Sequence, residues 1–393
     1  MDEPRQENPF GVPLGDIWNE VPLFREIQRV LLSSSGPVNW ELARQVGIAA
    51  ADWDRADPSP TAEDQRSFEE AVRVAELQVA GFTGLPAPGD VAGIEAVRRA
   101  RWVEANIEGL RPILEPMAAR VGRAIAESQG QALPEEARAG VAQLLGQLSP
   151  LLLGAQVGAV LGALGQQVLG QYDVAVPRPA GGSLLFVVPN VARFERDWSL
   201  DPTEFRTWVA IHEVTHRFEF ARPWTLPRFR ELLDDFSATL RLDVEGLQRR
   251  LEALDPSDPE AMRDMLASEE GLFGAVLDDE QRLKLGRIQA FMAAAEGYGD
   301  HVMHAIGARL LPGAPRIEEA MRRYRESERV DPVFARLLGI EVKREQYRLG
   351  KAFCDRIAEL TDETTLARMW DDAASLPSLP ELEEPSLWLA RIA

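Results

Sequence analysis

The residues best suited to chemistry are five consecutive ones, His212-Glu213-Val214-Thr215-His216. In an α-helix, histidines four positions apart lie one turn apart on the same face, so both imidazoles can reach one metal ion. Glu213 is rotated by about 100° from His212, so it can hold a water molecule beside the ion without being a ligand. With four histidines in 393 residues, chance rarely produces this pattern. The spacing therefore predicts a metal site with an adjacent carboxylate base.

A third ligand must come from elsewhere, because a catalytic zinc site uses three protein ligands and one open position. The single cysteine, Cys354, rules out a Cys-rich site. The best candidate is Glu296, which falls within the apolar stripe of an expected helix. A carboxylate buried there is costly unless it is paired or bound to a metal. The alternative is a buried salt bridge between Glu296 and an arginine.

Three further residues near Glu296 are candidates for the site. Asp300 follows one turn later, and it could accept the second N–H of a zinc-bound imidazole and so fix its tautomer. His301 and His304 are alternative ligands. On an ideal helix His301 lies about 140° round from Glu296, and His304 lies two turns on, so both are disfavoured.

The helix that must carry the two histidines has clear signals at both ends. Asp201 is expected to cap it, with Pro202 as its first residue and Glu204 as the third, the arrangement of a capping box. The helix should run to about Arg222 and end before Pro223. Its apolar stripe, spaced three or four apart, consists of Phe205, Trp208, Val209, His212, His216 and Phe220. Both histidines should therefore lie on the buried face.

Helical periodicity dominates the rest of the chain, at 60–82, 92–128, 135–171 and from about 202 to the end. Short β-type runs at 174–176 and 184–188 predict a small hairpin or the edge of a small sheet. A substrate peptide could add to the edge of 184–188, or this strand only completes the sheet. The predicted fold class is α+β, mostly helical, with a small sheet preceding the metal-binding helix.

Three regions are predicted along the chain. Residues 1–172 form an N-terminal helical region, 173–330 the metal-binding core, and 331–393 a C-terminal helical segment and tail that pack on the core. Trp370 and Trp388 are expected to anchor that tail.

Composition limits the function classes. The chain is 45% hydrophobic and 27% charged, as in ordinary globular proteins, and its net charge of −20 disfavours nucleic-acid binding. The first residues lack a basic and an apolar segment, so no secretory signal is predicted and a cytoplasmic location is expected.

A charge-free run at 139–172 needs a separate interpretation. Small residues at Gly154, Gly158 and Gly162 suit either a membrane helix contact or two soluble helices in close approach. Several glutamines and Pro150 favour buried helices, so no stable membrane span is expected.

Several segments resemble a zincin-like family of uncharacterised bacterial zinc metallopeptidases, some of which carry a label linking them to deazaflavin coenzyme biosynthesis. The resemblance covers roughly residues 165–390 and rests on Tyr172-Asp173, Phe186-Val187-Val188-Pro189-Asn190, Trp208 to Arg217, Glu296-Gly297, His301-Val302-Met303, Gly339-Ile340-Glu341, Lys343, Gln346-Tyr347, Gly350 and Phe353. It implies a zincin-like α+β fold, with His212, His216 and Glu296 as the zinc ligands. The family often has an aspartate where this chain has His304.

The expected activity is hydrolysis of a peptide or amide bond in a peptide or protein substrate. Zn²⁺ would activate a water and polarise the carbonyl, and Glu213 would act as general base. Tyr298, Tyr347 and Arg217 are possible transition-state donors, among which the sequence does not choose. Iron or manganese could occupy the same ligands. The alternatives are a catalytically silent zincin-like binding or scaffold protein, and a small-molecule amide or ester hydrolase of coenzyme metabolism.

Overall fold

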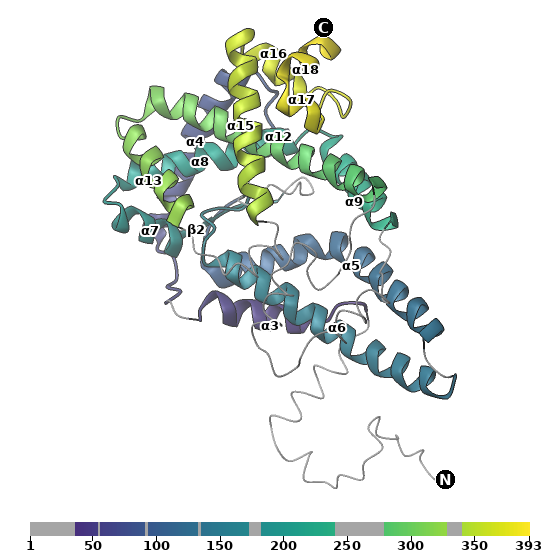
Figure 1. The fold of residues 1–393 in the computed structure, drawn as a ribbon. Coiled ribbons are helices and arrows are strands. Elements are labelled where there is room, and N and C mark those ends of the chain that lie inside the picture. The colour runs from purple at the N-terminus through teal and green to yellow at the C-terminus, as the bar shows by residue number, and fades with distance from the viewer. Residues whose placement is uncertain are drawn as a thin grey trace.

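The structure is a computed structural model that describes residues 36–53, 56–90, 93–132, 135–172, 182–239, 279–327 and 340–393, with side chains described except at 117, 121–148 and 325–347. It is a mostly helical α+β fold with one small parallel sheet, as predicted (Figure 1). The helices before the sheet's second strand are α3 (Trp40–Ala51), α4 (Ala62–Thr83), α5 (Arg99–Ala132) and α6 (Glu135–Gly165). The central helices are α7 (Val188–Asp197), α8 (Pro202–Phe220), α9 (Thr225–Thr239) and α12 (Asp279–Leu310). The C-terminal elements are α13 (Ala314–Ser327), α15 (Ile340–Leu360), α16 (Glu363–Ala367), the 3₁₀ helix η1 (Arg368–Trp370), α17 (Leu379–Glu383) and α18 (Pro385–Ile392).

The sheet pairs two strands that are far apart in the sequence. Strand β1 (Ile94–Val97) runs parallel to β2 (Leu184–Val187), with α5 and α6 between them in the chain. The prediction of helix from residue 92 was therefore wrong at its start, because α5 begins only at Arg99. The predicted hairpin partner of β2, residues 174–176, lies outside the described residues.

Two sets of hydrogen bonds hold the β1 segment extended. Besides its ladder with β2, the side-chain amide of Gln65 in α4 accepts from the backbone N–H of Ala96 at 2.9 Å and donates to the carbonyl of Ile94 at 2.7 Å. Both partners lie far from β1 in the sequence. Local periodicity could not reveal them, and tertiary contacts override a helical tendency in such a short segment.

Strand β2 is paired on both sides. Its second neighbour is the segment that follows α6, through an antiparallel bridge between Gly170 and Phe186 and a 2.9 Å hydrogen bond from Val187 N to the carbonyl of Leu169. At Phe186 and Val187 this edge is therefore already occupied, which argues against the prediction that a substrate peptide adds to the edge of 184–188. The alternative, in which this strand completes the sheet, agrees with the structure.

The glycines of the charge-free run face α3. A Cβ at Gly154 would lie 2.3 Å from the carbonyl oxygen of Asn39, and one at Gly158 would lie 2.3 Å from that of Ala43. Real atoms cannot approach so closely, so glycine is what allows the two helix backbones to touch. In the part of the chain that the structure describes, no helix combines the length and apolar character needed to cross a membrane.

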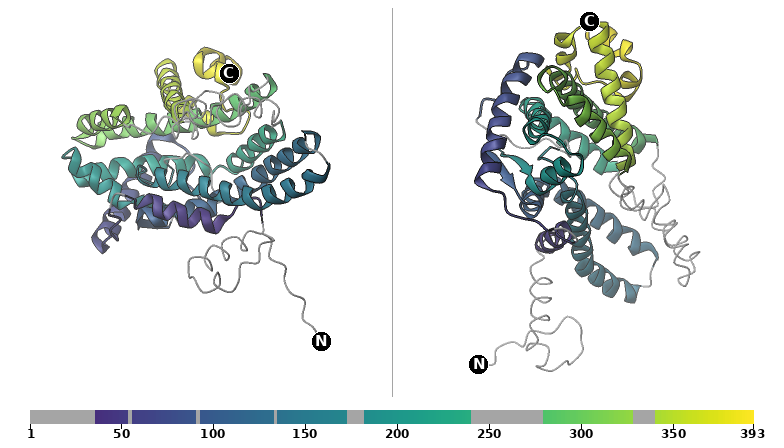
Figure 2. Two further views of the ribbon diagram at one scale, coloured as in Figure 1. Left: turned by 60° about the horizontal axis from the view of Figure 1, so that its bottom comes forward. Right: turned by 90° about the vertical axis from the view of Figure 1, so that its left-hand side faces the viewer.

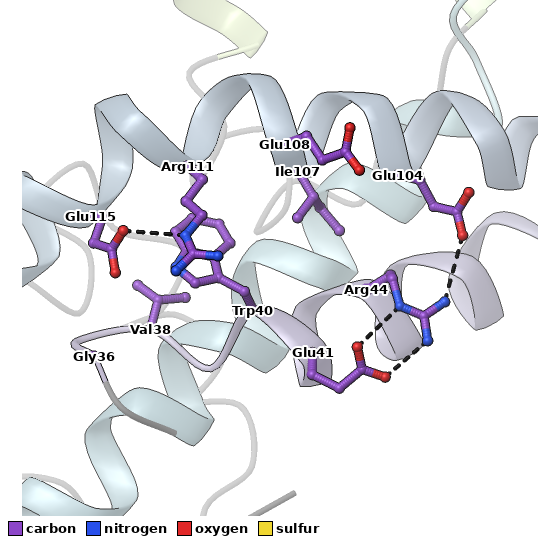
Figure 3. Close-up of a pocket in the computed structure, with 10 residues that line it drawn as sticks. All are labelled: Gly36, Val38, Trp40, Glu41, Arg44, Glu104, Ile107, Glu108, Arg111 and Glu115. Atoms are coloured by element: carbon purple, nitrogen blue, oxygen red, sulfur yellow. Dashed lines mark hydrogen bonds and ion pairs between the residues drawn. The ribbon is translucent and has the colours of Figure 1, made fainter. Parts of the chain in front are cut away.

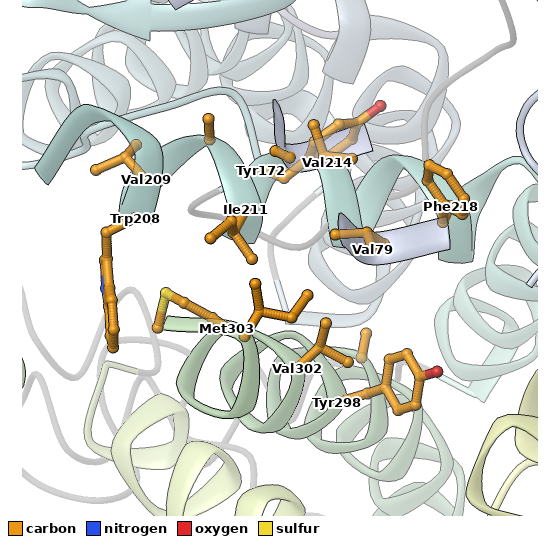
Figure 4. Close-up of a cluster of buried hydrophobic side chains, with 14 of the residues drawn as sticks. Val79, Tyr172, Trp208, Val209, Ile211, Val214, Phe218, Tyr298, Val302 and Met303 are labelled. Atoms are coloured by element: carbon orange, nitrogen blue, oxygen red, sulfur yellow. The ribbon is translucent and has the colours of Figure 1, made fainter. Parts of the chain in front are cut away.

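The main hydrophobic core lies around α8 and α12. Figure 4 shows Trp208 and Ile211 of α8 directed toward Val302 and Met303 of α12, with all four side chains buried. The same core includes side chains from α4 at one end of the chain and from α18 at the other. Burial of these apolar surfaces is the main force that fixes the two helices against each other.

The C-terminal tail packs onto this core, as predicted from its tryptophans. Trp370 and Trp388 are 1% and 0% exposed, and the indole N–H of Trp388 donates to the carbonyl of Ser375 at 2.8 Å. In the views of Figures 1 and 2, α15 crosses α12 and the short helices α16 to α18 lie beside it. The tail is therefore part of the shell around α12.

A separate pocket of about 610 Å³ lies between α3 and α5 (Figure 3). Its lining includes Trp40 and two arginines paired with acids: Arg44 with Glu41 and Glu104, and Arg111 with Glu115. It takes no lining from α8 or α12, so it is distinct from the site that the sequence predicts.

Candidate metal centre

Helix α8 carries both histidines into the core. Asp201 is its N-cap and accepts from the backbone N–H groups of Thr203 and Glu204 at 2.9 and 3.0 Å, as predicted. The capping box is incomplete, because the carboxylate of Glu204 accepts from Gly313 N at 2.7 Å instead of from the cap residue. The helix ends at Phe220, slightly before the predicted end.

Unlike a surface helix, α8 is buried on all sides along most of its length. Every residue from Thr207 to Phe220 is buried. His212 is 8% exposed and His216 is 0% exposed. Since polar groups are rarely buried without partners, the surroundings of these imidazoles indicate what they bind.

Helix α12 brings Glu296 to the two histidines. One potential ligand atom from each of His212, His216 and Glu296 lies within 4.8 Å of the other two, and these three form the one such group among the described residues. The Nε2 atom of His216 is 3.9 Å from Oε2 of Glu296, whose side chain is 1% exposed. The structure therefore brings together the three residues that the sequence singled out.

Small residues allow these helices to approach. A Cβ at Gly299 would lie 3.0 Å from Cε1 of His216, and one at Gly297 would lie 2.1 Å from the backbone of Gly350 in α15. Glycine at these positions lets α12 touch α8 on one side and α15 on the other. Close contact between the helices around Glu296 therefore depends on glycine.

The donor set fits a divalent metal ion. Two imidazoles and a carboxylate are a usual catalytic zinc set, which leaves a fourth position for water or substrate. Burial lowers the pKa of His212, but its attraction to Glu213 and the charges of Glu296 and Asp300 outweigh burial and raise that pKa to about 9. The surroundings of this imidazole thus favour positive charge strongly, and a metal ion would compete with the proton for it.

Glu213 is placed beside the three-residue group without belonging to it. Its Oε2 accepts from the backbone N–H of Tyr172 at 2.7 Å, and its Oε1 is 3.7 Å from Nδ1 of His212. Gly170 lies directly against this carboxyl group, since a Cβ there would be 2.3 Å from Cδ of Glu213. The carbonyl of Gly170 accepts from the indole of Trp102 at 2.8 Å, which anchors the segment.

Sequence reasoning missed Glu219, which contacts His216 directly. Its Oε2 is 2.7 Å from Nδ1 of His216, and both side chains are fully buried. Burial raises the pKa of Glu219 well above its ordinary value, against the opposing attraction of His212. The signal was present in the sequence, because a residue three positions after a histidine on a helix lies one turn away on nearly the same face.

Asp300, the residue predicted to orient an imidazole, is 2% exposed and lies on α12 one turn after Glu296. Its charge helps to raise the pKa of His212. The two alternative histidine ligands do not join the group. His301 contacts Asp355 through Nδ1 at 2.8 Å, and His304 contacts the Asp300 carbonyl through Nδ1 at 2.6 Å.

The three candidate transition-state donors are placed differently. Arg217 is held by Glu76 at 2.9 Å and by Asp90 at 3.2 Å, on the α4 side of α8. Tyr298 is 1% exposed and packs edge-to-face on Trp370. The side chain of Tyr347 lies outside the described part of the chain.

Comparison with known proteins places the chain in a family. The sequence matches the family described as zincin-like metallopeptidase over residues 38–389. A crystal structure of a Chloroflexus aurantiacus protein, provisionally designated a hydrolase with a novel fold, is 31% identical with a TM-score of 0.64, and the match covers 90% of this chain and 98% of that one. A comparison with curated proteins found no match. The extent of the family match, which includes both α8 and α12, shows that the chain belongs to the zincin-like metallopeptidase family.

Proposed function

We propose that the protein is a zinc-dependent metallopeptidase that hydrolyses a peptide or amide bond, with Glu213 as general base. The observation that carries the proposal is the convergence of His212, His216 and Glu296, whose ligand atoms lie within 4.8 Å of one another in the core. The family match and the hydrolase designation of the Chloroflexus aurantiacus protein support the same class of reaction.

His212, His216 and Glu296 would hold the zinc ion. When bound there, zinc supplies a Lewis acid for the carbonyl and lowers the pKa of a coordinated water. Glu213 would accept a proton from the attacking water and return it to the leaving amine. Because one oxygen of Glu213 is already bonded to Tyr172 N, the other oxygen is the one that would take the proton.

Asp300 would hold the imidazole of His212, which its charge already influences. Of the donor candidates, Tyr298 stands closest in the chain to Glu296, whereas the two ion pairs of Arg217 occupy its guanidinium. Tyr347 stays a candidate on the sequence alone. The oxyanion would need one such donor in addition to the metal.

The proposal is tested with the purified full-length protein, its metal content and a mixture of fluorogenic peptides. We expect stoichiometric zinc and hydrolysis in the wild type. Glu213→Ala should keep the zinc and lose hydrolysis by about 10²–10⁴-fold, the usual contribution of general acid–base catalysis. His216→Ala should lose both.

Two outcomes would contradict the proposal. Undiminished cleavage by Glu213→Ala would show that another group is the base. Full zinc content in His216→Ala would remove the ligand assignment. Stoichiometric zinc with hydrolysis of small amides or esters, but of no peptide, would favour the small-molecule hydrolase over the peptidase.

A further inference from the structure

One of the candidate ligands, His216, makes a short contact with Glu219. Glu219 lies one turn after His216 on α8, with 2.7 Å between Oε2 and the ring Nδ1, and both side chains are 0% exposed. A hydrogen bond in a site that excludes water is stronger than the same bond in water, because the local dielectric is low. Glu219 therefore has the geometry to control the ring.

The rest of the His216 environment fixes the plane of the ring. Phe220 stacks on it with ring centroids 5.6 Å apart and an interplanar angle of 7°. The ring of Tyr172 lies at 6.1 Å, and Gly299 faces the Cε1 edge. Such apolar packing recognises the shape of a flat ring. It does not distinguish the two orientations that differ by a half turn, which exchange nitrogen and carbon positions, because both have almost the same shape.

The hydrogen bond to Glu219 does distinguish them. Only one orientation places Nδ1 at the carboxylate, and in that orientation Nε2 faces Oε2 of Glu296 at 3.9 Å. With the proton on Nδ1, the ring donates to Glu219 and presents the Nε2 lone pair toward the site of the metal. A carboxylate behind a ligating imidazole also makes that imidazole a better donor to the metal.

The second carboxyl oxygen of Glu219, Oε1, gives further evidence of the role of this residue. Among the described residues, Oε1 of Glu219 is buried without a hydrogen-bond partner. A carboxyl group that served only to join helices would be expected to use both oxygens, because an unpaired buried oxygen is costly. Its described hydrogen bonding is instead directed to the His216 ring.

We propose that Glu219 is the positioning residue of the metal centre, which holds His216 as the Nδ1–H tautomer with Nε2 directed at the metal. The inference rests on the proposed function, because it assumes that His212, His216 and Glu296 bind zinc. It adds a residue that contacts neither substrate nor metal and acts through His216.

Two substitutions test this role in the full-length protein. Glu219→Gln keeps an oxygen that can accept from Nδ1–H but removes the charge. Glu219→Leu removes both and leaves an apolar group of similar volume. The measurements are the zinc dissociation constant, by competition with a chromophoric chelator, the visible spectrum of the Co²⁺-substituted protein and the thermal unfolding of the metal-free form.

Substitutions behind a ligating histidine typically weaken metal binding by about 10–100-fold, so we expect about 10-fold for Glu219→Gln and about 100-fold for Glu219→Leu. The Co²⁺ spectrum should change most in Glu219→Leu. The metal-free form of that variant should unfold at the same temperature as the wild type or higher, since a costly buried carboxyl group is gone.

Glu195→Gln is the matched control. Glu195 is also a buried glutamate, 8% exposed, but on α7 it pairs with Arg206 at 2.9 Å and contacts none of the three candidate ligands. Its substitution should leave the zinc dissociation constant and the Co²⁺ spectrum unchanged, whatever it does to stability.

The inference is wrong if both Glu219 variants bind zinc as tightly as the wild type. It is also wrong if Glu219→Leu lowers the unfolding temperature of the metal-free protein without changing zinc affinity, because that result assigns Glu219 a purely structural role. A wild-type protein that binds no zinc would instead overturn the proposed function, so the two failures are distinguishable.

Discussion

Four buried acidic residues lie around the imidazoles of His212 and His216. Each acid has different neighbours, which indicate a different role for each. Glu296 faces the imidazole pair, Glu213 is bonded to a backbone N–H, and Glu219 stands behind His216. The charge of Asp300 helps to raise the pKa of His212. Each is at most 2% exposed. Any of these acids that is ionised in the core needs compensating positive charge, which a divalent ion would supply.

At the scale of single residues, the placement of Glu213 can be tested through Gly170. A Cβ at Gly170 would lie 2.3 Å from Cδ of Glu213, so Gly170→Ala should push this carboxyl group out of position. A misplacement of about 1 Å can cost about 10²-fold in rate, and we expect a loss of kcat of that order with full zinc content. The measurement is peptide hydrolysis together with elemental analysis.

Gly89→Ala is the control for this substitution, because a Cβ at Gly89 would meet no atom within 4 Å. It should leave kcat unchanged. If Gly170→Ala is as active as the wild type, the orientation of Glu213 seen here is not the one that catalyses.

At the scale of elements, helices that touch at glycines hold the centre and its scaffold together. Gly299 admits the His216 ring, Gly297 and Gly350 join α12 to α15, and Gly158 joins α6 to α3. Well-packed helix contacts do not expand readily, so the position of each helix depends on the absence of a side chain on its neighbour.

The contact between α3 and α6 gives a stability test. Gly158→Ala places a Cβ 2.3 Å from a backbone carbonyl oxygen, and overpacking of this kind costs about 1–3 kcal/mol. Gly81→Ala on α4 meets no atom within 4 Å, and replacing a helical glycine usually stabilises by about 0.5–1 kcal/mol. Denaturant unfolding should therefore show opposite signs for the two variants. A neutral Gly158→Ala would contradict this packing.

His301 of the central helix α12 contacts two C-terminal elements through charge. Its Nδ1 contacts Asp355 of α15 at 2.8 Å and its Nε2 contacts Glu363 of α16 at 3.0 Å, while Lys351 also pairs with Asp355 at 2.6 Å. Burial lowers the pKa of His301, but its hydrogen bonds to Asp355 and Glu363 outweigh burial and raise that pKa to about 9. The imidazolium thus links α12 to α15 and α16.

This raised pKa predicts a pH dependence of stability. Since the folded pKa exceeds the ordinary value of 6.5, the stabilisation is complete below about pH 6.5 and is lost as the pH rises through about 9. It amounts to at most about 3 kcal/mol, because one pKa unit corresponds to about 1.36 kcal/mol and the carboxylates are partly exposed. The zinc-loaded wild type and His301→Gln should be compared by their free energies of unfolding. The difference between the two should shrink as the pH rises through this range. A difference independent of pH would contradict the ion pairs.

At the scale of the whole molecule, the candidate metal centre lies where the N-terminal and C-terminal parts of the chain meet. The core around α8 contains Phe68 of α4 as well as Trp370 and Trp388 of the tail. The chain as a whole has a net charge of −20, which also favours the binding of a cation. A cation bound by α8 and α12 would therefore stabilise the fold as a whole.

Thermal unfolding measures this stabilisation. Zinc that binds only the folded state adds about 2.7 kcal/mol to the free energy of unfolding when the free zinc concentration is about 100 times the dissociation constant. We expect added zinc to raise the Tm by several degrees and a chelator to lower it. Mg²⁺ at the same concentration should have little effect, since it prefers oxygen ligands. A Tm insensitive to both zinc and chelator would exclude a metal bound at the core.

Much of the centre could be predicted because its rules are local. The spacing of His212 and His216 places both rings on one helix face, and the cap at Asp201 defines where that helix begins. Glu296 stood out because a carboxylate within an apolar stripe needs a partner. The same local rules would have indicated Glu219, one turn beyond His216, had they been applied past the end of the H-E-x-x-H pattern.

The remaining features depend on contacts between distant segments. Strand β1 has its partner about ninety residues later, the direction of Arg217 depends on Glu76 and Asp90, and Gly170 reaches Glu213 only because β2 and Trp102 hold its segment in place. Helical spacing determined which residues share a face. Only the tertiary structure decided which helix and strand faces pack against each other, because contact between segments far apart in the chain leaves no periodic signal in the sequence.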